Sequence, residues 1–532
     1  MEDPLLSHLL ALAGLLALLL VVWTLGGARR SRSRGDGQLD LPPEVPGSWP
    51  VIGHLHLLRD PIPMHRIMAS MADRYGPAFM FRLGVHSVVV ISEHEAMREC
   101  FTTNDRVLAS RPRSKAGIHL GYSYAAFGFA KYGPFSRKMK KLALHELLSP
   151  HRLEALQYVR VSEIDTLIRG LYYNSTVING KTLNISLWLE HLALNVITRM
   201  IAGKRYFGLS SSDAEAAHVR RVMKEFMEVS GFPAISDLIP YTSWTDFWGT
   251  VKAMKRIGRE LDEIVGSWVE EHKKKRTIDG ERRKLDMNFI DVLISAIEDD
   301  DSILGYSRES IIKATVVVII VAGSDTTSLN LTWVLSLLLN HKHSLQRAQQ
   351  ELDLKIGRQR WAQDSDINSL PYLQAIVKES LRLYPPGPLS VPHEADGDCT
   401  VNGYLIPKGT RMFFNLWKLH RDPRIWPDPD KFLPERFLTG GHAAGVDASG
   451  RYFEFIPFGS GRRACPGSAL ALQITHLALA RLLQAFDMST PENATVDMTE
   501  GLAINLAKRN PLEVLLAPRL PAKLFGELMV SS

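Results

Sequence analysis

One cysteine of this chain lies in a loop whose composition suggests chemistry. Cys465 stands in "FIPFGSGRRACPG", residues 455–467, among glycines, arginines and prolines. The other two cysteines, Cys100 and Cys399, are far apart in the sequence and form no CxxC pair, so neither a disulfide framework nor a zinc site is indicated. Cys465 could be a nucleophile, a metal ligand or an inert core residue.

The neighbours of Cys465 favour a ligand to a large, flat, anionic cofactor. Gly459, Gly461 and Gly467 allow the backbone to approach a ligand closely. Backbone amides in such a turn lower the pKa of a thiol, and Arg463 supplies a permanent positive charge for carboxylates. Haem b with a cysteine thiolate on its iron meets each requirement, since thiolate ligation favours cleavage of the O–O bond.

A long apolar run, residues 314–339, carries a second candidate site. It is long enough to cross a membrane, but a carboxylate at bilayer depth costs about 2.5–3.5 kcal/mol, so Asp325 predicts a helix buried in the protein instead. Ala322 and Gly323 leave space beside this helix. Thr326 then has two interpretations: its hydroxyl faces a ligand, or it bonds back to the helix backbone, as is common for a threonine in mid-helix.

A third motif pairs opposite charges within an apolar helix. Glu379 and Arg382 are three residues apart, before Pro385 ends the helix. On a protein surface such a pair stabilises a helix by about 0.2–0.5 kcal/mol. The flanking residues are apolar, so we expect partial burial and a third partner, for which "FLPERF" offers Arg436.

The elements that must position these motifs indicate mainly α structure with small β-sheets (α+β). Residues 78–92 are rich in β-branched and aromatic residues around Gly84, which predicts a pair of short strands. Helical periodicity dominates the rest, for example in residues 213–229 and 251–275. A net charge of +6, from 63 Lys and Arg against 57 Asp and Glu, is too small over this length to indicate nucleic-acid binding.

The N-terminus predicts a membrane anchor. Residues 5–27 are apolar, long enough to span a hydrocarbon core of about 30 Å, and followed by arginines, so we expect an uncleaved signal anchor with the remaining chain in the cytosol. A cleavable signal peptide is the alternative, but its apolar region would be about 7–15 residues after a basic start. Residues 28–55, basic and then proline-rich, predict a stiff linker, which leaves residues 56–532 as the cytosolic haem-binding domain.

Together these motifs resemble the cytochrome P450 superfamily. Its haem-binding signature, FxxGxRxCxG, is matched by Phe458, Gly461, Arg463, Cys465 and Gly467. "AGSDTT", the Glu-x-x-Arg pair and "PERF" match the other signatures at the usual separations, and the anchor and proline hinge match its microsomal members. "PLSVPHEA" and "NLWKLHRDPRIWPDPDKFLPERF" further resemble the plant A-type class, most of all family 82.

The resemblance implies a cytochrome P450 fold and a haem-binding role for each matching residue of the loop. Cys465 would be the axial ligand of the haem iron, and Phe458 would pack beside its sulfur. Arg463 would pair with a haem propionate. Gly461 and Gly467 would permit the tight loop and its close contact with the porphyrin.

On the apolar helix, the resemblance implies that Thr326 helps to deliver protons to dioxygen and that Asp325 belongs to the same relay. Ala322 and Gly323 would leave room for oxygen. These four residues would therefore form the catalytic side of the haem site.

The resemblance also implies roles for polar residues outside these two segments. Glu379, Arg382 and Arg436 would form a triad that is structural and not catalytic. His393, after the "PPGPLSVP" turn, would reach a haem propionate.

One segment, "YGPFSRKMKK", departs from the plant pattern. Ser136 stands where tryptophan is usual, and Lys140 stands where a propionate-binding arginine is usual. Lys140 can still neutralise a carboxylate as a point charge, without the two-pronged geometry of arginine. Arg137 could substitute for it.

The resemblance implies a monooxygenase anchored in the endoplasmic reticulum membrane, with its catalytic domain in the cytosol. NADPH electrons would arrive through NADPH–cytochrome P450 reductase. One oxygen atom would enter a small apolar plant metabolite, such as an alkaloid, terpenoid or phenolic, by hydroxylation, demethylation or epoxidation. Mainly apolar segments would line the substrate: residues 110–130, 317–327, 389–391 and 503–506.

Two other functional classes remain as alternatives. A haem-thiolate isomerase or dehydratase needs no reductase and often lacks the acid–threonine pair. A noncatalytic haem carrier or sensor needs no proton relay. Asp325 and Thr326 therefore favour the monooxygenase over both.

Overall fold

The computed structural model describes the greater part of the chain: residues 14, 39–58, 61–177, 182–208, 214–231, 233–239, 242, 246, 248–279, 287–297 and 305–530. The predicted anchor, residues 5–27, lies outside these residues apart from Gly14, and so do residues 28–38 of the predicted linker.

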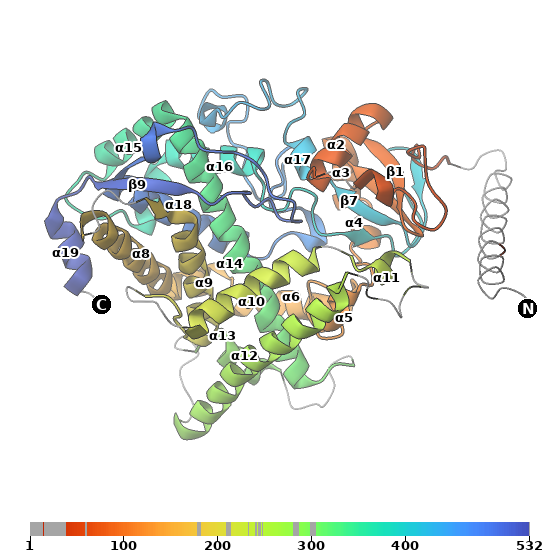
Figure 1. The fold of residues 1–532 in the computed structure, drawn as a ribbon, viewed down its shortest axis with the longest axis horizontal. Helices are drawn as coiled ribbons and strands as arrows, with labels where there is room; N and C mark the ends of the chain where they lie inside the picture. The colour runs from red at the N-terminus through yellow and green to blue at the C-terminus, as the bar shows by residue number, and fades with distance from the viewer. Residues whose placement is uncertain are drawn as a thin grey trace, which may run out of the picture.

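A long helix, α14 (Arg308–Asn340), runs through the middle of the protein (Figure 1). It packs against several others: α9 (Ile185–Ala202), α10 (Ala214–Ser230), α12 (Thr250–Asp279), α16 (Pro371–Leu383) and α18 (Ser468–Ala485). Within the described residues, α14 is the one helix long and apolar enough to span a membrane, and 61% of its most apolar stretch is buried in the protein. The prediction of a buried helix over residues 314–339 is confirmed.

Further helices surround this core. The longer ones are α2 (Met64–Tyr75), α6 (Pro134–Glu146), α8 (Gln157–Val177) and α15 (Lys342–Lys355). The shorter ones are α3 (His94–Phe101), α4 (Asp105–Leu108), α5 (Lys115–His119), α7 (Pro150–Ala155), α11 (Ile235–Leu238), α13 (Phe289–Ala296), α17 (Leu416–Leu419) and α19 (Ala522–Val530). Single 3₁₀ turns are η1 (Leu55–Leu58), η4 (Asp364–Ser369), η5 (Pro434–Phe437), η6 (Gly461–Arg463) and η7 (Pro491–Asn493).

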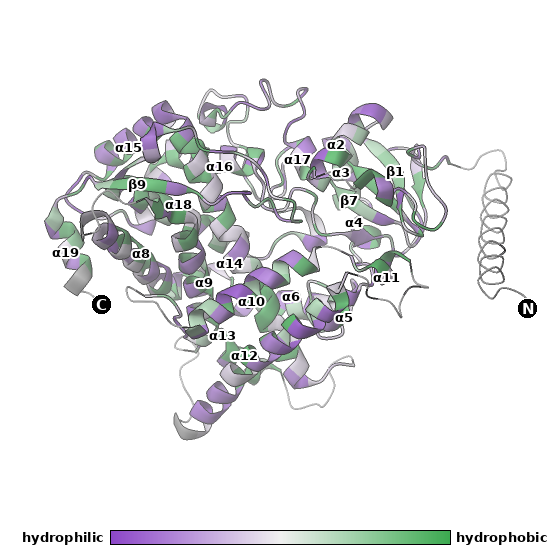
Figure 2. Cartoon of the chain, viewed as in Figure 1, coloured by the Kyte–Doolittle hydropathy of each residue, from purple (hydrophilic) through white to green (hydrophobic). Residues whose placement is uncertain are grey.

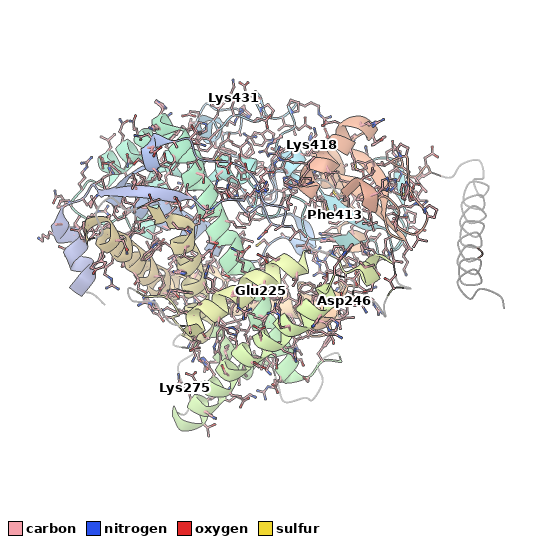
Figure 3. All side chains as sticks on the ribbon, in the orientation of Figure 1. Glu225, Asp246, Lys275, Phe413, Lys418 and Lys431 are labelled. Atoms are coloured by element: carbon pink, nitrogen blue, oxygen red, sulfur yellow. The ribbon has the colours of Figure 1, made fainter. Side chains whose placement is uncertain are left out.

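Helices α10 and α12 confirm the helices predicted for residues 213–229 and 251–275. Both carry many hydrophilic residues, coloured purple in Figure 2. Glu225 on α10 lies at their contact (Figure 3), where its carboxylate pairs with Arg256 of α12 at 2.7 Å. Arg221 of α10 pairs in turn with Glu260 of α12 at 2.9 Å. Exposed charge pairs therefore line the solvent side of this helix pair.

Small sheets complete the architecture in the described part of the chain. A four-stranded sheet has the order β1-β2-β7-β4, from β1 (Ala78–Leu83), β2 (His86–Ile91), β7 (Arg411–Phe414) and β4 (His393–Glu394). A three-stranded sheet has the order β3-β9-β8, from β3 (Leu183–Asn184), β9 (Glu513–Pro518) and β8 (Phe486–Ser489), and β5 (Cys399–Val401) pairs with β6 (Tyr404–Ile406). β1 and β2 confirm the strand pair predicted for residues 78–92. They turn at Gly84, whose φ is +61° and where a Cβ would lie 2.1 Å from the Leu238 carbonyl oxygen.

The described part of the predicted linker is packed against the protein. The backbone of Met80 in β1 donates to the Pro43 carbonyl and accepts from the Val45 amide, each at 2.8 Å. The buried His54 connects this segment to β1. Its Nδ1 accepts from the Arg82 amide at 2.9 Å, and its Nε2 donates to the Val45 carbonyl at 2.8 Å. Residues 43–55 therefore belong to the globular domain, which begins earlier than the predicted boundary at residue 56.

Candidate functional site

The cysteine loop is held by its own backbone and by α4. The Cys465 amide donates to the Phe458 carbonyl at 2.9 Å, which closes the turn. Gly461 has a φ of +65°, and a Cβ there would lie 2.5 Å from Oδ1 of Asp105, so this position requires glycine. The same carboxylate accepts from the Arg462 amide at 3.0 Å. The loop is thus fixed between α4 and the start of α18.

The Cys465 thiol has an open side within crowded surroundings. Its side chain is exposed, yet burial is the main influence on its pKa and raises it. The amides of Gly467 and Ser468 and the ammonium of Lys140 act in the opposite direction and favour the thiolate. The loop amides therefore stabilise a negative sulfur, as the sequence predicts. Their effect on the pKa of Cys465 is smaller than that of burial.

Small residues of α14 face different neighbours. Ala322 is exposed although it lies in mid-helix next to the buried Val321. Gly323 faces α9 instead, where a Cβ would lie 3.0 Å from the Ile197 side chain. The missing side chain of Gly323 therefore allows α9 to approach α14, and its role of leaving room for oxygen stays a prediction. Ala322 keeps the open position.

The acid–threonine pair lies one turn further along α14. Thr326 Oγ1 donates to the Ala322 carbonyl at 2.7 Å, which is the helix-bonded state that the sequence offered as one interpretation. Burial raises the pKa of Asp325 to about 6. Asp325 Oδ2 accepts a 2.5 Å hydrogen bond from Nδ2 of Asn505, a residue that the sequence did not single out.

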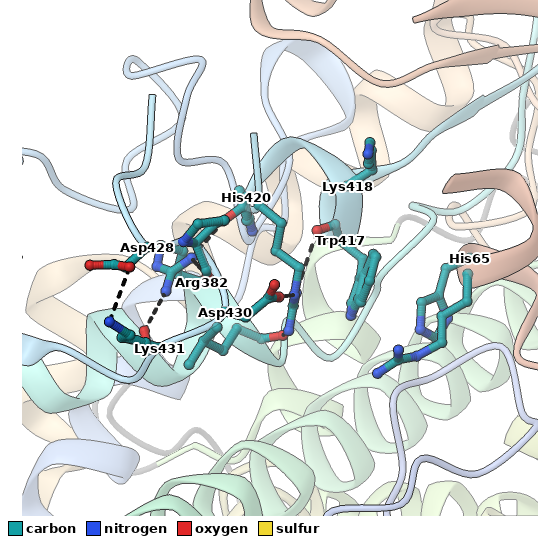
Figure 4. Close-up of polar contacts among 12 residues, drawn as sticks. His65, Arg382, Trp417, Lys418, His420, Asp428, Asp430 and Lys431 are labelled. Atoms are coloured by element: carbon teal, nitrogen blue, oxygen red, sulfur yellow. Dashed lines mark hydrogen bonds and ion pairs between the residues drawn. The ribbon is translucent and has the colours of Figure 1, made fainter. Parts of the chain in front are cut away.

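The structure brings together the three residues predicted as a triad. Arg382 donates from Nε and Nη2 to the two oxygens of Glu379 at 2.7 and 2.8 Å, and Arg436 Nε reaches the same carboxylate at 3.3 Å. All three side chains are buried. Arg382 also donates to backbone carbonyls of His420, Pro429 and Lys431 (Figure 4). The carboxylate and the carbonyls together satisfy the buried guanidinium.

His420 connects this triad to the cysteine loop. Its carbonyl accepts from Arg382 at 2.7 Å, and its ring Nε2 accepts from the backbone amide of Ile456 at 3.1 Å. Burial lowers the pKa of His420 to about 3, so the ring is neutral and able to accept. Ile456 belongs to the "FIPF" start of the loop, so the triad and the loop share one hydrogen-bonded network.

A cluster of basic side chains lies beside the loop. Arg463 donates to the carbonyls of Ala109, Phe127 and Ala130, and Arg111 donates to those of Val391 and Pro392. Nδ1 of buried His393 bonds to the carbonyl of Leu108 at 2.7 Å. The basic cluster, defined as Arg111, Arg463 and His393, thus binds backbone carbonyls within residues 108–109, 127–130 and 391–392.

The pKa values of the basic cluster are shifted by burial and by neighbouring groups. Among the described residues that shift them there is no carboxylate. Burial lowers the pKa of Arg463 to about 10, and burial together with Arg463 lowers the pKa of Arg111 further. Burial and both arginines also lower the pKa of His393. An anionic group placed here would relieve this repulsion, which is what haem propionates would do. The donor set and the open thiol of Cys465 therefore fit haem.

The departures from the plant pattern have structural partners. Ser136 is buried and caps α6 through the Gly133 amide at 3.1 Å. Lys140 donates from Nζ to the carbonyls of Arg462 and Ala464 at 2.9 and 2.8 Å, so it holds the cysteine loop. Arg137 is exposed and lies over Tyr132, so it does not take the place of Lys140. The cation that the sequence did not single out is Arg111, which the fold places beside His393 and Arg463.

Known proteins decide the family. The family model described as Cytochrome P450 matches residues 42–516. The chain is a cytochrome P450. Cytochrome P450 CYP82J17 of Trigonella foenum-graecum is 49% identical to it over 97% of this chain and 98% of its own length. Xanthotoxin 5-hydroxylase CYP82C4 of Arabidopsis thaliana is 47% identical over 91% and 94%, which supports the likeness to plant family 82.

Solved structures agree with this assignment. A zebra fish cytochrome P450 with progesterone is 27% identical to this P450, with a TM-score of 0.74. The match covers 86% of this chain and 100% of the zebra fish chain. The P450 fold predicted from the motifs is confirmed. As a plant P450 it is a haem-thiolate monooxygenase that takes haem b and receives NADPH electrons through a reductase. The relatives named as hydroxylases and demethylases do not favour the isomerase or carrier alternatives.

Proposed function

We propose that this P450 oxidises a small apolar plant specialised metabolite, such as an alkaloid, terpenoid or phenolic. The observation that carries the proposal is a set of exposed apolar side chains in or beside the predicted lining segments: Ile118 at 39%, Val391 at 56% and Leu502 at 53%. Exposed apolar side chains in segments predicted to line a binding site favour an apolar ligand. Vinorine hydroxylase of Rauvolfia serpentina is 46% identical to this chain, and Flavonoid-6-hydroxylase of Ocimum basilicum is 47% identical.

The experiment that tests this proposal is a screen of turnover. The full-length protein, reductase and NADPH are incubated with a panel of alkaloids, terpenoids and phenolics, and products are detected by mass. We expect at least one compound to gain one oxygen atom or lose a methyl group, only with NADPH present. Conversion limited to strongly charged compounds would contradict an apolar substrate.

The residues of the site have separate proposed roles. Haem, when bound, supplies the iron on which dioxygen is reduced and its O–O bond is cleaved. Cys465 would ligate the iron, with Phe458 beside the sulfur and Gly461 and Gly467 shaping the loop. The basic cluster would bind the propionates, and Lys140 would fix the loop carbonyls.

Asp325 and Thr326 are proposed to deliver protons. A carboxyl with a pKa of about 6 changes its protonation readily near neutral pH, as a relay requires. The Thr326 hydroxyl donates to the Ala322 carbonyl, and its oxygen can accept a further hydrogen bond. The exposed Ala322 would leave the space beside this hydroxyl in which oxygen binds.

Replacing Thr326 with Ala is expected to uncouple NADPH oxidation. A positioned proton donor typically contributes about 10²–10⁴-fold to rate, so hydrogen peroxide should become the main product of the consumed electrons. Peroxide and NADPH are measured together. Thr332→Ala is the matched control, because Thr332 makes the same helix bond, to the Ser328 carbonyl at 2.9 Å, but is buried two turns away. Equal peroxide yields from both variants would contradict the role of Thr326.

Replacing Arg111 with Met is expected to weaken haem retention. Losing a charged hydrogen-bond donor costs about 1.5–3 kcal/mol, which corresponds to roughly 10–100-fold faster haem loss. The rate is measured by transfer of haem to apomyoglobin. Arg113→Met, which removes an exposed arginine two residues away, should leave the rate unchanged. Equal rates for the two variants would show that Arg111 does not hold the propionates.

We propose that the domain is held at the endoplasmic reticulum membrane. Residues 5–27 would be the anchor and the following basic and proline-rich residues the linker, with the domain in the cytosol. NADPH–cytochrome P450 reductase would be the electron donor. Arg462, exposed at the cysteine loop, is a candidate contact for its acidic surface. Loss of membrane association on deletion of residues 1–38, in a protein that still binds haem, would support this placement.

A further inference from the structure

Asp325 has a partner from a distant part of the chain. Asn505 lies between Glu500 and Lys508, which form an isolated β-bridge before β9, and donates from Nδ2 to Asp325 Oδ2 at 2.5 Å. We propose that Asn505 is a positioning residue for proton delivery: its amide holds the Asp325 carboxyl in both protonation states while Asp325 supplies protons towards Thr326. This inference rests on the relay role proposed above for Asp325 and Thr326.

The backbone next to Asn505 is fixed through both polar groups of the Leu506 peptide backbone. The Leu506 amide donates to the Pro386 carbonyl at 2.9 Å. The Leu506 carbonyl accepts from Nε1 of Trp333 at 2.6 Å, and Trp333 is a fully buried residue of α14. Asn505 itself is buried. The turn therefore presents the amide to Asp325 from a defined position, as a positioning residue requires.

Asp325 has charged groups around it but none of them hydrogen-bonds to its carboxyl. Among the described contacts, Asn505 is the one side chain that does. The charged groups that face it are Glu190 on α9, and Lys224 and Glu228 on α10. Glu190 is paired with Arg220 of α10 at 3.0 Å. Burial is the largest influence on the pKa of Asp325 and raises it, whereas the hydrogen bond from Asn505 is the next largest and lowers it. Removing Asn505 should therefore raise this pKa.

An amide suits a carboxyl group that gains and loses a proton. Its NH₂ group donates to the carboxylate, as in the observed bond. After rotation of the amide about χ2, its oxygen accepts from the protonated carboxylic acid. A lysine or arginine would favour the ionised state alone, and an aliphatic residue would pair with neither state. Asn505 can thus keep Asp325 in place through both halves of a proton transfer.

The test follows how NADPH electrons leave the enzyme. Without added substrate, oxygen is reduced by O₂ + NADPH + H⁺ → H₂O₂ + NADP⁺, or by O₂ + 2 NADPH + 2 H⁺ → 2 H₂O + 2 NADP⁺. The second route needs further proton delivery, so the peroxide share reports the relay independently of electron flux. The full-length haem-loaded protein and reductase in phosphatidylcholine vesicles are compared from mildly acidic to mildly alkaline pH. The variants are Asn505→Leu, Asn505→Asp, Asp325→Asn and the double variant Asp325→Asn/Asn505→Leu.

We expect the peroxide share of the wild type to change with pH around one midpoint. Asn505→Leu should move that midpoint up by about one pH unit, since a hydrogen bond to the charged form is lost. Asn505→Asp, of nearly equal volume, should move it further, because a second carboxyl opposes ionisation. Asp325→Asn should abolish the transition, and Asn505→Leu should then shift nothing. An unchanged ferrous-CO spectrum shows that each variant binds haem normally.

The possible failures are distinguishable. If Asp325→Asn removes the transition but both Asn505 variants keep the wild-type midpoint, the inference is overturned and the proposed relay stands. If Asp325→Asn keeps the wild-type transition, or the wild type shows none, the relay role of Asp325 fails and this inference fails with it. If Asn505→Leu does not bind haem, the Asn505→Asp midpoint decides.

Discussion

Replacing Cys465 with Ser should abolish the haem-thiolate spectrum and all NADPH-dependent turnover. A serine hydroxyl is not ionised near neutral pH and cannot donate electron density to iron as a thiolate does. The purified variant should hold little haem, and its reduced, CO-bound form should lack the absorbance band of thiolate ligation. The loop amides of Gly467 and Ser468, which favour a negative sulfur, would lose their partner.

Cys399→Ser is the matched control for this prediction. Cys399 is a half-buried thiol in β5, and burial raises its pKa to about 11. This thiol is therefore protonated near neutral pH and poorly suited to bind iron. The control should retain haem, spectrum and turnover. A thiolate band in Cys465→Ser, or its loss in Cys399→Ser instead, would contradict the assignment of the axial ligand.

Replacing Glu379 with Gln should destabilise the protein and lower its yield of correctly ligated haem. The change leaves the buried guanidinium groups of Arg382 and Arg436 without a countercharge. Breaking a buried ion pair costs about 3–5 kcal/mol, a large part of the 5–15 kcal/mol that typically separates folded from unfolded domains. The soluble yield, the urea unfolding midpoint and the ferrous-CO spectrum are measured together.

The same spectrum tests whether the triad supports the cysteine loop. Arg382 donates to the His420 carbonyl and His420 accepts from Ile456, so a loosened triad should also disturb the loop. Glu270→Gln is the control, because Glu270 pairs with Lys273 at the same i,i+3 spacing but on the surface. Exposed pairs contribute about 0–1 kcal/mol, so the control should resemble the wild type. Equal midpoints for the two variants would contradict a structural triad.

The motifs were readable from the sequence because their chemistry is local. The cysteine loop needs Gly461 at a positive φ, and Glu379 needs Arg382 one helical turn away. The buried α14 followed from the cost of Asp325 in a membrane. Strands β1 and β2 followed from aromatic residues before Gly84 and β-branched residues after it. Each of these inferences depends on residues that are neighbours in the chain.

The remaining features depend on contacts between distant segments. Arg111 meets carbonyls of Val391 and Pro392, and Asn505 meets Asp325, across sequence separations that no periodicity reveals. Gly323 packs closely against Ile197 on α9, a contact between distant segments that the sequence does not reveal. Thr326 kept both interpretations, since a hydroxyl that bonds to its helix also has an oxygen free to accept.

Incorporation of labelled oxygen tests the central claim most directly. The full-length protein, reductase and NADPH are supplied with ¹⁸O₂ and a metabolite that the screen shows to be hydroxylated, and the product is analysed by mass spectrometry. We expect the product to carry one ¹⁸O atom and to form only with both NADPH and reductase present, and we expect Cys465→Ser to form none. A product without the label, or one formed equally without NADPH, would contradict a haem-thiolate monooxygenase.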